Sequence, residues 1–159
     1  MFLILLPVIQ TKAKTKVPEP TFEETVETMV REHKVMLDRL IAAWEHRQEE
    51  INLLAEVIYH ENWHTDKEHL AAYYTGAVVM NRVNSKAWPD TVKKVLYQKG
   101  QYSTTKLFFT KEIPAECYEM ARDIYKNGTP DVPTNVIFQA MRPLGKTWKK
   151  VNTDYFCYG

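Results

Sequence analysis

Residues 70–83 read LAAYYTGAVVMNRV, and this stretch decides the fold class. Its middle, residues 75–80, is apolar on nearly every side apart from Thr75, which is typical of a helix buried at the centre of a small domain. We therefore predict a buried central helix over about 70–84. Gly76 lies inside this helix at a cost of roughly 1 kcal/mol relative to Ala, and such a cost is usually accepted where another backbone or a ligand comes close.

A long amphipathic helix is predicted ahead of this stretch. Thr21 and Glu24 have the spacing of a capping box, in which each side chain bonds the other residue's backbone amide. The apolar residues that follow, with His33 in the same register, recur at alternating spacings of four and three: Val26, Val30, Leu37, Leu40 and Trp44. Such a seam packs along another helix, so residues 21–46 either dock on their own domain or form a spacer arm or a homodimer. Arg47 interrupts the seam, and a separate helix is predicted over about 51–64.

Further elements are predicted after the buried helix from turn signals and residue preferences. They are a short helix over 88–98, a helix over about 114–127, and two short strands over 135–140 and 154–158. Pro114 and Gly128 mark the ends of the longer helix, because Pro is favoured at helix starts and Gly after helix ends. The strands are rich in aromatic and β-branched residues. The predicted class is therefore α+β, mainly α, with a short β element late in the chain.

The bulk composition excludes several classes of protein. The chain has 159 residues and a formal net charge of +1, so it lacks the strong positive charge that is typical of nucleic-acid-binding proteins. No glycine-rich nucleotide-binding motif occurs in the sequence. Its two cysteines, Cys117 and Cys157, are too few for a four-Cys zinc site. The first ten residues are almost all apolar but too short to span a bilayer, and are interpreted as a truncated export signal or an apolar start.

We divide the chain into three parts on these grounds. They are an apolar start and linker over 1–20, the amphipathic helix over 21–50, and a domain over 51–159.

The segment LLAEVIYHENWH, residues 53–64, carries the strongest candidate for chemistry. On a helix Leu54, Ile58 and Glu61 share one stripe, so Glu61 continues an apolar face. Apolar surroundings raise the pKa of a carboxyl group, as a general acid working near neutral pH requires. Spacing alone is equally consistent with a buried glutamate that only bonds a structural partner.

The same segment also contains the pattern H-E-x-x-H, at His60, Glu61 and His64. On one helix face two such histidines can bind Zn²⁺ with the glutamate as general base, so a zinc metallopeptidase is an alternative function. A catalytic zinc site requires a third protein ligand, and no second short histidine motif follows. We therefore expect no metal and no other cofactor.

Four blocks of sequence carry a resemblance to a known family. They are LAEVIYHE at 54–61, GAVVMNRV at 76–83, a series running from WPDT through VLYQ to GQYS over 88–103, and a tail at 138–140 and 155–158. In these blocks the chain resembles the cell wall hydrolase family of the spore cortex-lytic enzymes (SleB-like). It departs from the family where a second acidic residue usually follows the catalytic glutamate, and where Asp154 replaces a histidine.

This resemblance implies a small lysozyme-like domain that cleaves peptidoglycan between N-acetylmuramic acid and N-acetylglucosamine, as a lytic transglycosylase. It implies Glu61 as the single catalytic acid, because one carboxyl group suffices when the sugar's own 6-hydroxyl is the nucleophile. The substrate-binding residues expected are Gln101, Tyr102, Ser103, Asn81, Tyr97 and Trp63. The implied partner is the glycan strand, with no nucleic acid and no nucleotide. The implied location is outside the cell, at the cell wall. A phage-encoded lysin would also reach this location. A non-catalytic wall-binding protein is the remaining alternative.

Overall fold

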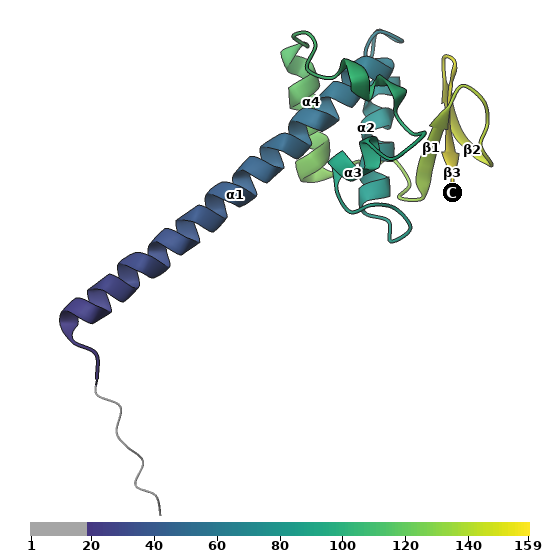
Figure 1. Cartoon of the computed structure of the whole chain (residues 1–159). Coiled ribbons are helices and arrows are strands. Elements are labelled where there is room, and N and C mark those ends of the chain that lie inside the picture. Colours follow the sequence, from purple (N-terminus) through teal and green to yellow (C-terminus); the bar gives the residue numbers. More distant parts are fainter. Residues whose placement is uncertain (1–18) are drawn as a thin grey trace, which may run out of the picture. The chain divides into compact units, whose positions relative to one another are not determined.

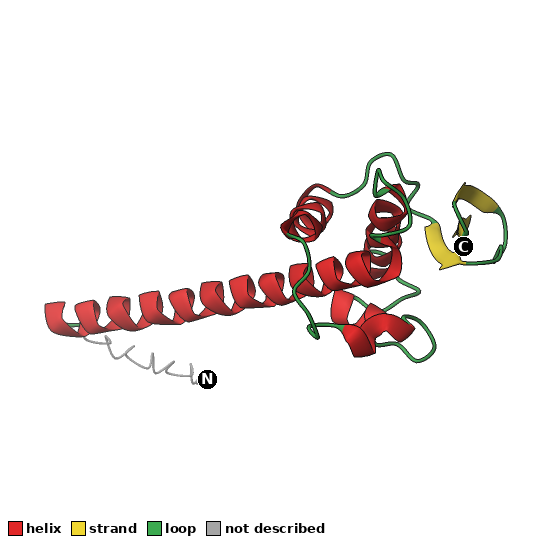
Figure 2. Cartoon of the chain, turned by 90° about the horizontal axis from the view of Figure 1, so that it is seen from above, coloured by secondary structure: helices red, strands yellow, loops and turns green. Residues whose placement is uncertain are grey.

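The computed structural model describes residues 19–159, which form four α-helices, a 3₁₀ helix and a three-stranded sheet (Figures 1 and 2). Our interpretation of the apolar start falls on residues 1–18, which lie outside the described residues. Packing divides the chain into two units, residues 1–40 and 41–159, and each is described by itself. No helix among the described residues combines the length and the apolar character that a membrane span requires.

The first helix, α1, is continuous from Phe22 to Asn62 (Figure 1). Our prediction of two separate helices, the second ending at residue 64, is therefore wrong. The polar residues 47–50 do not break the helix, because Arg, Gln and Glu are all good helix formers. The capping box at its start is present: the Thr21 amide donates to the Glu24 carboxylate at 2.8 Å, and the Glu24 amide donates to Thr21 Oγ1 at 3.2 Å.

The apolar seam of α1 is exposed in the first unit. Val26, Val30, Leu37 and Leu40 all have large exposed fractions. Seven residues after Trp44, the seam reaches Ile51, which is buried in the second unit. The side chains of this seam are therefore exposed in the N-terminal part of α1, and the seam continues into the core at Ile51. The homodimer through residues 21–46 stays a prediction.

We expect the double substitution Leu37→Glu and Leu40→Glu to convert a dimer into a monomer, because it places charges in the seam where apolar side chains would meet. Sedimentation of wild type and variant at equal concentration measures this. Arg39→Glu, which changes a charge outside the seam, is the matched control and should leave the mass unchanged. A wild type that sediments as a monomer at every concentration tested contradicts the prediction.

The second unit is built around α2, Leu70–Val83, which is almost wholly buried as predicted. At Gly76 it packs against both the C-terminal part of α1 and helix α4, Ala115–Asn127. A Cβ added at Gly76 would stand 2.6 Å from Ile124 Cδ1 and 3.1 Å from Ile58 Cδ1. Gly76 therefore allows close packing against isoleucine side chains of α1 and α4, rather than against a backbone or a ligand.

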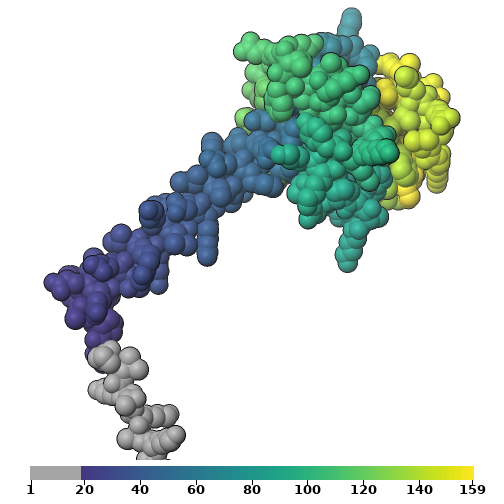
Figure 3. Space-filling model, in the orientation of Figure 1, coloured from purple at the N-terminus to yellow at the C-terminus, as the bar shows by residue number. Residues whose placement is uncertain are grey.

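The sheet packs on the other side of α2 and forms one flank of the second unit (Figure 3). Its strands are β1 (Val136–Ala140), β2 (Thr147–Val151) and β3 (Asp154–Tyr158). They are antiparallel in the order β1-β3-β2. The strand β2 was not predicted from the sequence, because this edge strand is largely exposed and its two lysines hide the apolar alternation.

Two short helices complete the second unit. They are α3 (Val92–Leu96) and a 3₁₀ helix, η1 (Ser103–Leu107). Thr91 caps α3 by accepting a hydrogen bond from the Lys94 amide at 3.2 Å. The class α+β, mainly α, with a small β element late in the chain, is confirmed.

Candidate functional site

Glu61 lies in the last turn of α1 and is partly buried. Thr104, in η1, donates a hydrogen bond to Glu61 Oε1 at 2.5 Å. Burial raises the pKa of Glu61 above that of an ordinary carboxyl group, and the nearby charge of Asp154 raises it further. The hydrogen bond from Thr104 and the neighbouring His60 lower this pKa and so oppose the shift in part. The group therefore holds its proton to a higher pH than an exposed glutamate does.

Asp154 reaches this site from the start of β3. With the Asn62 amide oriented so that its donors face acceptors, Asn62 Nδ2 donates to Asp154 Oδ2 at 3.0 Å and to the Glu61 carbonyl oxygen at 3.1 Å. In that orientation Asn62 Oδ1 accepts from Gln139 Nε2 on β1 at 2.7 Å. Burial raises the pKa of Asp154 as well. The end of α1 and the sheet are thus joined directly behind Glu61.

Neither Thr104 nor Asp154 was predicted from the sequence as a site residue. Thr104 directly follows the predicted GQYS segment, so extending that segment by one residue would have found it. Asp154 was noted only as a departure from the family pattern. Its position near Glu61 depends on the antiparallel return of β3, which no short-range pattern predicts.

An open hollow of about 330 Å³ lies beside η1. Four of the predicted substrate-binding residues line it: Tyr97, Gln101, Tyr102 and Ser103. Arg82 holds two of these side chains, because its NH1 donates to Gln101 Oε1 at 3.0 Å and to the Tyr102 hydroxyl at 3.4 Å. Burial raises the pKa of Tyr102 to about 12, so its phenol stays neutral. The hollow therefore offers amide and hydroxyl groups, the polar partners that suit a sugar.

The other two predicted substrate-binding residues, Asn81 and Trp63, are buried. Asn81 Nδ2 donates to the carbonyl oxygens of Pro133 and Val136, both at 3.0 Å, and so ties α2 to the start of β1. The Trp63 ring stacks on His69 with the ring centroids 3.7 Å apart. The structure does not bring these two side chains into the hollow beside η1.

The histidine pair does not lie on one helix face, because α1 ends at Asn62, before His64. His60 points toward the buried Glu56, with Nε2 at 3.3 Å from the Glu56 carboxylate, while His64 is exposed. Within residues 19–159, no three His, Cys, Asp or Glu side chains gather closely enough to hold a metal ion. The H-E-x-x-H spacing therefore does not have its usual helical geometry here.

A partly buried carboxyl group of raised pKa close to residues that line a hollow is a candidate active site. Comparison with known families identifies the kind of enzyme. Residues 66–156 match the Cell Wall Hydrolase family, and the chain belongs to this family. The protein is thus assigned to the enzymes that degrade the cell wall, with peptidoglycan as substrate and a cell-wall-related location. No curated protein and no solved structure matches the chain significantly.

The matched residues include Asn81, Gln101 and Asp154. The match begins at residue 66, five residues after Glu61, and so does not include Glu61. Glu61 is therefore a candidate because of its burial and its contact with Thr104, and not because of this match. The C-terminal part of α1 that carries it is nevertheless packed in the same core as α2.

Proposed function

We propose that the protein cleaves the glycan strand of peptidoglycan between N-acetylmuramic acid and N-acetylglucosamine, with Glu61 as its single general acid and base. One observation carries this proposal. Glu61 is a partly buried carboxyl group of raised pKa that bonds Thr104, at the edge of the segment whose side chains line the open hollow.

The reaction begins when protonated Glu61 donates its proton to the glycosidic oxygen and the bond to the anomeric carbon breaks. An oxocarbenium-like centre forms on the muramic acid residue. The Glu61 carboxylate then takes the proton of that sugar's 6-hydroxyl, whose oxygen bonds the anomeric carbon and gives a 1,6-anhydro product. The proton that Glu61 lost is thereby restored. Proton transfer by a positioned group contributes typically 10²–10⁴-fold to the rate.

The neighbouring side chains have separate roles in this proposal. Thr104 holds Glu61 Oε1, which leaves Oε2 as the oxygen that carries the transferred proton. Gln101, Ser103 and Tyr97 are exposed in the hollow and bind the sugar's acetamido and hydroxyl groups or its apolar face. Arg82 positions Gln101 and does not itself contact substrate.

The pH profile of cleavage provides a test of the acid's identity. Activity of a proton donor falls as pH rises through its pKa, so a lower pKa moves the alkaline limb to lower pH. We expect Asp154→Asn to move the limb of kcat/KM to lower pH, because it removes a charge that raises the pKa of Glu61. Thr104→Val should move it the opposite way, because it removes a hydrogen bond that lowers this pKa. Shifts of the same sign in both variants would contradict Glu61 as the donor.

Product analysis separates this reaction from its alternatives. Mass spectrometry of digested sacculi should show anhydro-muropeptides from the wild type. Reducing muramic acid ends would instead indicate hydrolysis, with Asp154 as the candidate for activating water. Binding to the wall with no product of either kind would indicate the non-catalytic alternative.

A further inference from the structure

A second groove in the unit of residues 41–159 exposes three aromatic rings. Trp44 on α1, Tyr97 at the end of α3 and Phe109 after η1 line a hollow of about 410 Å³. Their exposed fractions are 61%, 53% and 60% respectively. A soluble protein rarely leaves several large rings of this kind together at the surface unless they bind something.

This groove is separate from the site of Glu61. Asn52, which lines the groove, precedes Glu61 by nine residues on α1, so the two side chains project about 180° apart around the helix. The groove shares Tyr97 with the hollow beside η1. It therefore adjoins the catalytic hollow at Tyr97, and its other two rings, Trp44 and Phe109, lie outside that hollow.

Packing behind the groove holds two of its rings in place. The buried Phe108 meets Tyr97 and Phe109 edge-on, with ring centroids 6.4 Å apart in each case. Phe108 is itself stacked on His60 at 5.8 Å. The two exposed rings thus have a fixed support, which lowers the entropy lost when a ligand binds them.

The backbone at Phe109 is strained, with φ at 58°. This is the left-handed region, which a bulky side chain rarely occupies, and strain of this kind concentrates at ligand sites. The adjoining turn fixes the conformation, since Thr110 Oγ1 donates to the Leu107 carbonyl oxygen at 2.6 Å. In this conformation the Phe109 ring is exposed.

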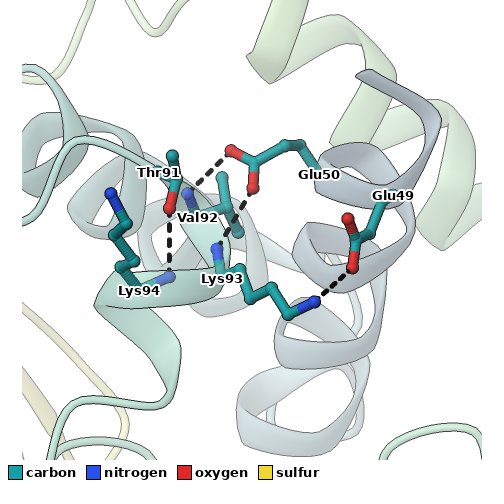
Figure 4. A network of polar contacts seen from close by, with 6 residues as sticks. All are labelled: Glu49, Glu50, Thr91, Val92, Lys93 and Lys94. Carbon is teal, nitrogen blue, oxygen red and sulfur yellow. Dashed lines mark hydrogen bonds and ion pairs between the residues drawn. The ribbon is translucent and has the colours of Figure 1, made fainter. Parts of the chain in front are cut away.

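Polar groups border the rings on the α1 side. Gln48 and Asn52 supply amides, and the Lys93 ammonium pairs with the Glu49 carboxylate at 2.7 Å (Figure 4). Rings flanked by amides and an ion pair suit a ligand with apolar faces and hydroxyl edges, which is the chemistry of a pyranose sugar. The volume is that of a small-ligand site.

We propose that the groove of Trp44, Tyr97 and Phe109 is a second, non-catalytic saccharide-binding site for the wall glycan. The choice of this polymer rests on the proposed function. Binding of a second stretch of the same strand raises the effective concentration of substrate at the catalytic site without any new catalytic contact.

The test compares wild type with the double variant Trp44→Ala and Phe109→Gly by cosedimentation with purified peptidoglycan sacculi. We expect about tenfold weaker binding, because two ring contacts are lost. Phe109→Gly also relieves the backbone strain, so the variant is not expected to fail by unfolding at this position. Met141→Ala, which removes an exposed apolar side chain elsewhere, is the control and should bind as wild type does.

Two further readouts make the outcome decisive. Turnover of short soluble glycan fragments should be unchanged in the double variant, because such fragments reach only the catalytic site. Equal binding of sacculi by wild type and double variant overturns the proposal. A change in sedimentation mass caused by Phe109→Gly alone, which lies outside the seam of α1, also overturns it, because the groove would then be a protein interface. If the wild type binds sacculi but releases no cleaved glycan, the proposed function fails while the binding site stands.

Discussion

Glu61→Gln should reduce the rate of glycan cleavage by about 10²–10⁴-fold, because the amide cannot donate the proton that the leaving oxygen requires. Gln has nearly the same size as Glu and can still accept the hydrogen bond from Thr104 through its amide oxygen. Folding and binding of sacculi should therefore be retained. The rate is measured as release of soluble muropeptides from sacculi, with circular dichroism to verify the fold.

Two controls give this result its meaning. Glu68→Gln changes an exposed carboxylate close in sequence and should keep full activity. His64→Ala, or treatment with EDTA, should also leave activity intact, whereas a zinc site at His60 and His64 would lose it. Full activity in Glu61→Gln would exclude this residue as the acid and the proposed mechanism with it.

The sequence predicted the parts of this site that lie within one segment. The apolar stripe that leads to Glu61 is a local pattern, and so is the GQYS segment whose side chains line the hollow. Asp154 was not predicted, because it approaches Glu61 only through the pairing of β3 with β1. Trp63 was expected to contact sugar since it is aromatic, yet nothing in the local sequence indicates that His69 stacks on its ring.

The same division holds for the fold. The buried helix at residues 70–83 was predicted well, because a helix that is apolar on almost every side is stable only in the core of the domain. The continuous α1 was not, since a polar stretch at residues 47–50 looks like a boundary when its tertiary contacts are unknown. Glu50 illustrates the point: it sits in a polar run, yet it is buried against the start of α3.

Glu50→Ala should lower the free energy of unfolding by about 2–4 kcal/mol, since buried groups left without a hydrogen bond cost about 1–3 kcal/mol each. The Glu50 carboxylate accepts from the amides of Val92 at 2.7 Å and Lys93 at 3.2 Å (Figure 4). Its removal leaves the first two amides of α3 without this partner, and Val92 is fully buried. Urea unfolding of wild type and variant measures the difference.

Glu49→Ala is the matched control, because it removes the neighbouring glutamate from the same helix turn. Glu49 pairs with Lys93 at 2.7 Å, but both side chains are about half exposed, at 49% and 59%. An exposed ion pair of this kind contributes about 0–1 kcal/mol, so the control should unfold close to wild type. Glu50→Gln should fall between the two, because it keeps one oxygen that can accept from Val92. If Glu49→Ala and Glu50→Ala lowered the free energy of unfolding equally, the contact between α1 and α3 would depend on the exposed ion pair and not on the hydrogen bonds from the amides of Val92 and Lys93.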